Sequence, residues 1–261
     1  MTILDKIVEN KRSEVEQNKK QQPLQELEKS PYFERKTFSL GDAILGSKNF
    51  GIIAEFKRKS PSKGFINENA QIKHVIPSYE KAGACAISIL TDLDFFGGKN
   101  EDLTLGRELA NIPILRKDFI IDPYQIFEAK SIGADAILLI SSILSKEQVN
   151  DFAKLAKKLN LSVLFEVHDL EEIDKVSEYV DVVGVNNRNL KSFEVSIETS
   201  IALSKYIPGN FVKISESGIR SANDIHRLKN HGFSGFLVGE SFMTKHSPGD
   251  ACKEFLLDLF S

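Results

Sequence analysis

Eight short apolar segments, separated by stretches of helical periodicity, constrain the fold of this chain more than any other feature. They span residues 51–56, 85–90, 112–119, 135–140, 162–167, 181–186, 211–216 and 235–240. Each is apolar nearly throughout, which is typical of parallel strands buried on both faces. Stretches between them, such as 122–132, 145–160 and 221–231, have the spacing of amphipathic helices. The pattern predicts an α/β protein.

The number of strand–helix units favours one α/β architecture. Eight units fit a closed (β/α)8 TIM barrel. An open doubly wound sheet is the alternative, but it would normally carry a GxGxxG turn after its first strand, and residues 57–64 read KRKSPSKG. Glycines at three helix-to-strand junctions suit left-handed helix C-caps: Gly83, Gly133 and Gly232. We predict that residues 1–261 form a single barrel domain.

Residues 1–48 precede the first strand and are predicted to form an N-terminal helical extension. Its first helix should span residues 2–20, with Thr2 as the cap and Asp5 three residues later. One face of this helix carries Leu4, Ile7, Val8 and Val15, with the stem of Lys11 between them.

Charge and composition exclude several classes of partner. The formal net charge is −3, which gives no reason to expect a nucleic acid or an anionic membrane as partner. No apolar run approaches the ~18 residues of a membrane span, and the N-terminus is too acidic for a signal or transit peptide. We predict a cytoplasmic location. The five histidines lack the spacing of metal ligands, and His168 with Glu171 is interpreted as the start of a helix.

Polar residues gather where the predicted strands end. In a TIM barrel the C-terminal strand ends carry the chemistry. Several of these residues are in phase with buried ones, so sealing them in without partners would cost several kcal/mol each. A single charge at a strand end is usually a solvated tip, but a set around one mouth can pair and shift pKa values. The set comprises Glu55, Lys57, Lys117, Glu166, Asn186, Arg188, Glu216, Ser217, Gly239 and Glu240.

A phosphate site is indicated by two glycine-containing loops, residues 216–219 and 238–241. Glycine lets backbone N–H groups approach an anion, and barrels often bind phosphate after their last two strands. Lys57 and the turn at residues 60–62 could close the same pocket from the first strand.

Six motifs along the chain are IAEFKRKSPSKG, ILRKDFIIDPYQI, LFEVHDLEE, VGVNNRNL, SESGI and FLVGESFM. Together they resemble the indole-3-glycerol phosphate synthase family of tryptophan biosynthesis. The resemblance covers essentially the whole chain and implies a TIM barrel with an extra N-terminal helix. It implies a carboxy-lyase that converts 1-(2-carboxyphenylamino)-1-deoxyribulose 5-phosphate to indole-3-glycerol phosphate, carbon dioxide and water. It also implies that no metal or organic cofactor is used.

The resemblance assigns roles to matching residues. Lys117 would be the general acid, Glu166 the general base, and Lys57 an assisting acid, with Glu55 and Asn186 orienting them. Arg188 would hold the departing carboxylate, and Phe96 and Phe119 would line the aromatic pocket. The phosphate and its surroundings would be held by Ser60, Glu216, Ser217, Gly218, Gly239 and Glu240. One departure is Lys99, where the family more often has Ser after DFFGG.

Two other functions fit parts of the sequence. Another phosphosugar barrel, such as a phosphoribosylanthranilate isomerase, would not need the Asn186–Arg188 motif for a carboxylate. A non-catalytic phosphate-binding barrel would need neither Lys117 nor Glu166. The leading interpretation is therefore the lyase, acting on a small phosphosugar substrate, with other tryptophan-pathway enzymes as candidate partners.

Overall fold

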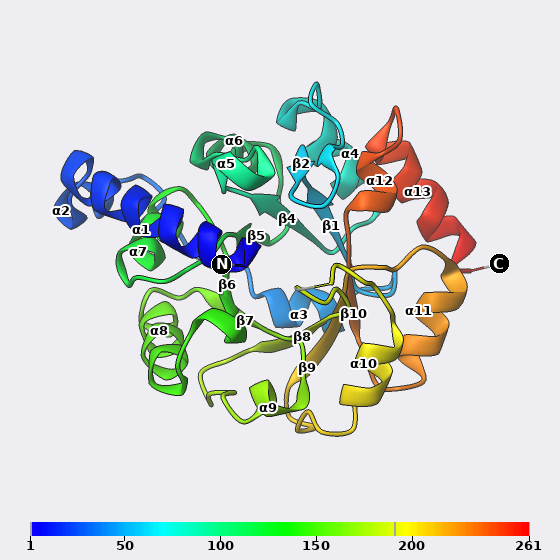
Figure 1. Ribbon diagram of the computed structural model, residues 1–261. Coiled ribbons are helices and arrows are strands. Elements are labelled where there is room, and N and C mark those ends of the chain that lie inside the picture. The colour runs from blue at the N-terminus through cyan, green and yellow to red at the C-terminus, as the bar shows by residue number, and fades with distance from the viewer. Residues whose placement is uncertain (1, 191, 261) are drawn as a thin grey trace.

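The protein is described by a computed structural model that covers residues 2–190 and 192–260. Its centre is a closed barrel of parallel strands, in the order β1-β10-β9-β8-β7-β6-β5-β4 (Figure 1). The strands are β1 (Ile52–Phe56), β4 (Ala86–Leu90), β5 (Ile114–Lys117), β6 (Ala136–Ile140), β7 (Ser162–Val167), β8 (Val182–Asn186), β9 (Val212–Glu216) and β10 (Gly235–Val238). Each predicted apolar segment contains one of these strands. The TIM-barrel prediction is confirmed, and the open sheet is excluded.

The barrel closes where its first strand meets its last. β1 pairs in parallel with β10, with Ile53 opposite Leu237, and on its other side with β4, where Ile53 faces Ala86. The loop after β1 contains a small antiparallel hairpin, β2 (Lys59–Ser60) and β3 (Gly64–Phe65). The sequence predicted a loop there but not this pairing.

Helices surround the barrel and alternate with its strands. They are α4 (Ile72–Ala82), α5 (Leu93–Phe96), α6 (Asn100–Leu109), α7 (Tyr124–Ser131), η1 (Ser141–Ile143), α8 (Lys146–Lys158), α9 (Leu170–Ile173), α10 (Glu198–Leu203), α11 (Ala222–Lys229), α12 (Glu240–Met243) and α13 (Pro248–Asp258). Gly83 caps α4 in the left-handed conformation, and Gly133 and Gly232 also have positive φ, as predicted.

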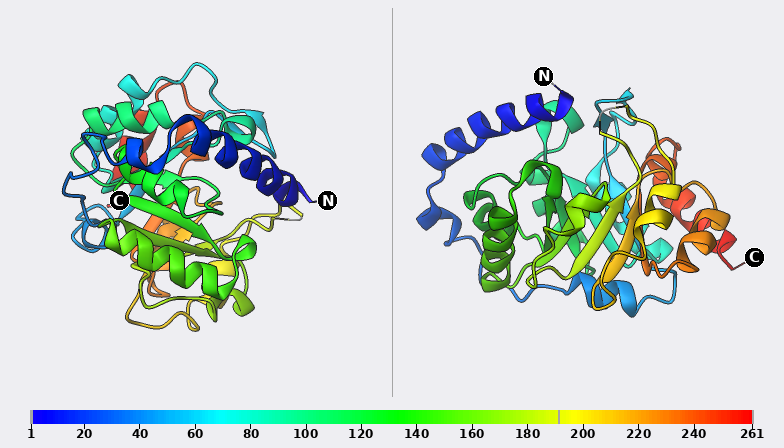
Figure 2. Two further views of the ribbon diagram at one scale, coloured as in Figure 1. Left: turned by 90° about the vertical axis from the view of Figure 1, so that its left-hand side faces the viewer. Right: turned by 60° about the horizontal axis from the view of Figure 1, so that its bottom comes forward.

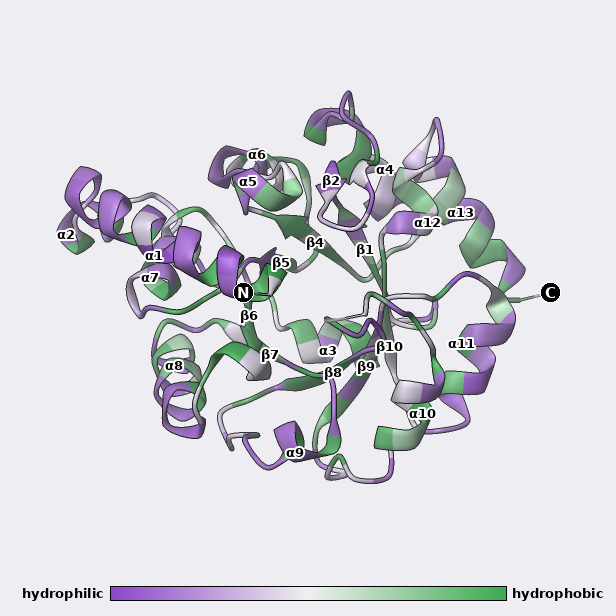
Figure 3. Cartoon of the chain, viewed as in Figure 1, coloured by the Kyte–Doolittle hydropathy of each residue, from purple (hydrophilic) through white to green (hydrophobic). Residues whose placement is uncertain are grey.

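Alternation along the strands separates two apolar layers. In β1, Ile53 faces the barrel interior with Leu115 and Leu164, whereas Ile52 and Phe56 pack outward against the helices. Hydropathy follows the same division, with apolar strands at the centre and polar outer helix faces (Figure 3). Glu55 and Ile53 lie two residues apart in this strand, so the charge of Glu55 enters the barrel interior.

The segment before β1 contributes to both ends of the barrel. It contains α1 (Ile3–Gln21), α2 (Leu24–Leu27) and α3 (Leu40–Leu45), and Thr2 caps α1 in a capping box with Asp5, as predicted. α1 crosses one end of the barrel and α3 lies at the other (Figure 2). Leu40 and Ile44 of α3 pack against the interior residues of the strands and close that end.

Across residues 2–190 and 192–260, each helix is either too short or too polar to span a bilayer.

Candidate active site

The strand ends bring every predicted site residue to one pocket. Its lining includes residues that come from all parts of the chain. They are Glu55, Lys57, Ser60, Phe96, Lys117, Phe119, Glu166, Asn186, Arg188, Glu216, Ser217, Gly218, Gly239 and Glu240. Their common surface follows from the parallel barrel, in which all C-terminal strand ends point to the same mouth.

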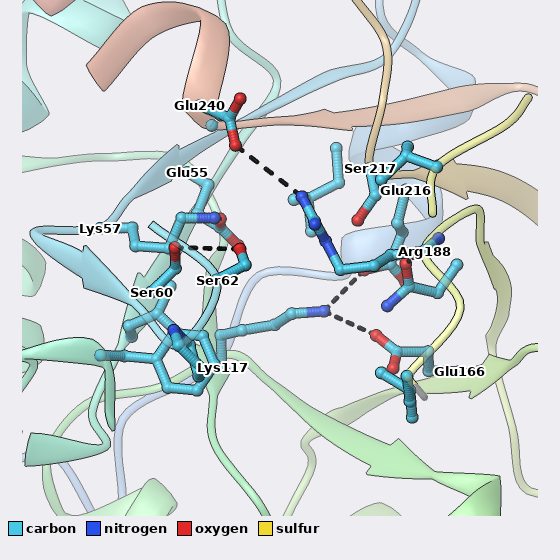
Figure 4. Close-up of a pocket in the computed structure, with 18 of the residues that line it drawn as sticks. Glu55, Lys57, Ser60, Ser62, Lys117, Glu166, Arg188, Glu216, Ser217 and Glu240 are labelled. Carbon is cyan, nitrogen blue, oxygen red and sulfur yellow. Dashed lines mark hydrogen bonds and ion pairs between the residues drawn. The ribbon is translucent and has the colours of Figure 1, made fainter. Parts of the chain in front are cut away.

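Lys117 lies at the centre of this pocket, at the end of β5 (Figure 4). Its Nζ lies 2.9 Å from Oε2 of Glu166 and 2.6 Å from Oε2 of Glu216. Both carboxylates are almost fully buried, and the lysine side chain is 14% exposed. One ammonium group therefore pairs with two buried carboxylates, and its side chain is still partly exposed in the pocket.

This crowding separates the pKa values of the three groups. Burial alone would lower the pKa of Lys117, but the carboxylates of Glu166 and Glu216 outweigh it and raise the pKa. Burial would raise the pKa of Glu166, yet Lys117 and His168 lower it well below its usual range. Burial raises the pKa of Glu216 to about 7, because Lys117 only partly compensates. The site thus holds a charged lysine, an ionised carboxylate and a second carboxylate that titrates near neutrality.

Strand β1 supplies a second acid–base pair. Lys57 Nζ lies 2.8 Å from Oε1 of Glu55, whose other oxygen lies 3.4 Å from the Ser88 hydroxyl. Gly239 follows β10 beside this pair, and a Cβ at position 239 would lie 2.7 Å from Glu55 Oε1. Because glycine has no side chain, it leaves space at this position for the Glu55 carboxylate.

Arg188 and Glu240 face each other across the pocket rim, 3.8 Å apart. The Arg188 backbone N–H donates to the side-chain oxygen of Asn186 at 3.0 Å, which fixes the turn after β8. Glu240 also accepts from Lys63 of the β1 loop at 2.6 Å. Arg188 is thus an accessible cation with a distant partner, whereas Lys63 ties the loop to α12.

The turn after β9 has two successive residues in the left-handed region of backbone conformation. Ser217 and Gly218 both have positive φ, 67° and 73°. A Cβ at position 218 would lie 2.3 Å from Cγ1 of Val195, so this turn requires glycine for space as well as for conformation.

The apolar part of the pocket has one wall that was predicted and one that was not. The rings of Phe96 and Phe119 lie 5.9 Å apart in a tilted arrangement. Opposite the strand ends, Ile3, Leu4 and Ile7 of α1 also line the pocket. The apolar face of α1 was visible in the sequence, but nothing there showed that it would cover the mouth.

Two further residues have surroundings that the sequence did not reveal. His168 lies 3.3 Å from Glu166 and 3.3 Å from Glu172, while α9 is capped by Asp169. Lys99, the departure from the family motif, is exposed at the N-cap of α6. Among the described residues, no three His, Cys, Asp or Glu side chains are arranged to hold a metal ion.

Comparison with known proteins assigns the family. The family described as indole-3-glycerol phosphate synthase matches residues 4–255. The chain belongs to the indole-3-glycerol phosphate synthase family. An indole-3-glycerol phosphate synthase of Bacteroides thetaiotaomicron is 44% identical over 254 residues, which cover 97% of each chain. One from Acinetobacter baumannii is 43% identical over 253 residues, covering 96% of this chain and 94% of the relative.

Similar solved structures extend to other barrels. A tryptophan synthase complex from Pyrococcus furiosus contains a chain with a TM-score of 0.60 and 16% identity, covering 81% of this chain and 98% of that one. Thiamine phosphate pyrophosphorylase from the same organism gives a TM-score of 0.58 at 15% identity, covering 82% and 98%. At these identities the likeness concerns the fold alone.

Proposed function

We propose that this chain catalyses the reaction of its family, the ring closure of 1-(2-carboxyphenylamino)-1-deoxyribulose 5-phosphate to indole-3-glycerol phosphate with loss of carbon dioxide and water. The observation that carries the proposal is Lys117, held 2.9 Å from Glu166 and 2.6 Å from Glu216 in an apolar-walled pocket. An acid and a base side by side are what a ring closure followed by a dehydration requires.

Each chemical step can be matched to a side chain. Lys117 would protonate the ketone oxygen as the aromatic ring carbon attacks, because its raised pKa keeps the proton on Nζ at neutral pH. Loss of carbon dioxide would restore the aromatic ring. Glu166 would then accept a proton during the loss of water, assisted by Lys57 as an acid. Glu55 would orient Lys57 through their 2.8 Å ion pair.

The bound substrate would contact three parts of the pocket. The phosphate would lie against the turns at Gly218 and Gly239, beside Ser60 and Lys57. The aromatic ring would lie between Phe96, Phe119 and the apolar residues of α1. Arg188 would hold the carboxylate that leaves, since its only acidic partner among the described residues, Glu240, is 3.8 Å away.

The decisive experiment is to mix purified protein with the carboxyphenylamino substrate and follow indole absorbance or fluorescence. The chain contains no tryptophan, so its own emission is weak at indole wavelengths. Formation of indole-3-glycerol phosphate without added metal or cofactor supports the proposal. Isomerisation without release of carbon dioxide would point to a phosphosugar isomerase, and tight binding without turnover to a non-catalytic barrel.

A cytoplasmic location and association with other tryptophan-pathway enzymes are further parts of this proposal. Cell fractionation tests the first. Co-purification of the tagged chain with those enzymes tests the second, since a chain that acts alone would be recovered without them.

A further inference from the structure

His168 follows β7 and lies behind the pocket rather than in its lining. Its Nδ1 is 3.3 Å from Oε2 of Glu172, and its Nε2 is 3.3 Å from Oε1 of Glu166, the latter an ion-pair distance without hydrogen-bond geometry. The ring is only 12% exposed. A histidine held between two buried carboxylates has an environment that favours the imidazolium form.

The start of α9 fixes this histidine in place. Asp169 caps the helix by accepting from the backbone N–H of Glu172 at 3.1 Å. Glu172 in turn accepts from the backbone N–H of His168 at 2.6 Å, so one carboxylate holds both the main chain and the ring. Asp169 and Glu172, which lie outside the pocket lining, thus help to hold the imidazole in place.

The two oxygens of Glu166 face opposite cations. Oε2 lies 2.9 Å from Lys117, on the pocket side, and Oε1 faces His168. The charges therefore alternate along Glu172, His168, Glu166, Lys117 and Glu216. Without His168, Lys117 would be left to pair with both Glu166 and Glu216.

We infer that His168 is a positioning residue that keeps Glu166 ionised and its Oε2 turned toward the pocket. The inference rests on the proposed function, because it concerns the base of that reaction. Two buried carboxylates that share one ammonium group favour retention of a proton, and a protonated Glu166 could not accept another. In agreement, burial lowers the pKa of His168 but the carboxylates of Glu166 and Glu172 raise it to about 10.

The first test is the pH profile of His168→Gln, which removes the charge and keeps a side chain of similar size. Loss of a neighbouring cation raises the pKa of Glu166, so the low-pH limb of kcat should move up by about one pH unit or more. On that limb kcat should fall about tenfold for each pH unit of the shift, with KM changed by less than about threefold. An unmoved limb would overturn the inference, and so would a variant whose only defect is lower stability.

The matched control is His74→Gln on the outer face of α4, where the ring is exposed. It should leave the profile unchanged. Glu172→Gln is a second variant in case His168→Gln does not fold. It should move the low-pH limb in the same direction by a smaller amount, because it weakens the charge on His168 without removing the ring.

A substrate-free test separates this inference from the proposed function. Nitrogen NMR of the histidine rings should show His168 protonated at both nitrogens at about pH 8, and Glu172→Gln should lower its titration midpoint. A neutral His168 at that pH would overturn the inference even if the enzyme turns over normally. A wild-type protein that forms no indole product would overturn the proposed function alone.

Discussion

Two lysines lie on opposite sides of β5 and pair with different buried carboxylates. Lys117 projects into the barrel mouth, whereas Lys11 of α1 reaches the outer side and lies 2.9 Å from Asp118 and 3.1 Å from Asp92. Lys11, Asp92 and Asp118 have no exposed side-chain surface. Adjacent residues at the end of β5 thus belong to two separate ionic clusters. The outer cluster consists of Lys11, Asp92 and Asp118, and the inner cluster of Lys117, Glu166 and Glu216.

In the outer cluster Asp118 is saturated with hydrogen bonds, whereas Asp92 Oδ2 has none among the described residues. Asp118 accepts from Thr91, Arg116 and Lys11, and from the backbone N–H of Phe119. Burial would raise the pKa of Asp118, but Lys11 and Arg116 hold it well below its usual range.

The inner cluster is incompletely paired. Glu216 Oε1 is buried without a hydrogen-bond partner among the described residues, and burial raises the pKa of Glu216 to about 7. A pocket carboxyl that is incompletely paired and titrates near neutrality identifies the place where protons can move, whereas Asp118 stays ionised and holds structure together.

Lys11→Met should cause the largest effect, and it should be on stability. Breaking a buried ion pair from one side leaves Asp92 and Asp118 without their shared cation, which typically costs roughly 3–5 kcal/mol. Denaturant unfolding measures this loss. Lys19→Met on the same helix removes a more exposed pair with Asp122 and should cost only about 0.2–1 kcal/mol. Equal losses for the two variants would contradict the comparison.

Lys117→Met should act on turnover instead. We expect kcat to fall on the order of 10²-fold or more, the usual scale of general acid catalysis. Substrate Kd, from titration of the inactive variant, should change by less than about tenfold, or ~1.4 kcal/mol. Stability should fall less than in Lys11→Met, because Glu216 can take up a proton near neutrality and Asp118 cannot. If the variant turned over normally, the general acid would be Lys57 instead of Lys117.

Arg188→Ala tests the accessible cation at the rim. A charge-assisted hydrogen bond to the substrate carboxylate is worth roughly 1.5–3 kcal/mol. The variant should therefore weaken binding of the substrate by this amount and binding of a decarboxylated analogue by much less. Calorimetric titration with both ligands gives the comparison. Equal losses of affinity for the two ligands would mean that Arg188 does not bind the substrate carboxylate.

Glu216→Gln should have the smallest effect, with a sign opposite to that of Lys11→Met. A carboxyl whose pKa is higher in the folded state than in the unfolded state lowers the free energy of unfolding as pH rises from about 4.5 to 7. This loss of stability persists above pH 7. Near pH 8 the variant should gain about 1 kcal/mol, or roughly 2–4 °C in Tm. The gain should vanish near pH 4.5. A loss of stability at pH 8 would mean that Glu216 is structural.

The sequence predicted those features that depend on local pattern. Strands buried on both faces read as apolar runs, and the phase of Glu55, Lys117 and Glu166 with apolar neighbours placed them at one mouth. The roles assigned to these residues stay predictions until the variants are measured.

Long-range partners could not be predicted from such patterns. The sequence suggested that only the stem of Lys11 would be buried, whereas its ammonium group is buried too, paired with acids far along the chain. The one available signal was its place between Ile7 and Val15 in an apolar stripe. His168 was interpreted only as the start of a helix, because the orientation of a ring between two carboxylates is a tertiary property.

The pairing of β1 with β10 also sets the order in which the protein can become active during synthesis. Glu55 and Lys57 leave the ribosome early, but the strand that completes their surroundings ends at Val238. A nascent chain that stops before β10 can hold most of its helices and still lack a closed mouth and the turn at Gly239. The last barrel strand to be translated is therefore the one that completes the binding site.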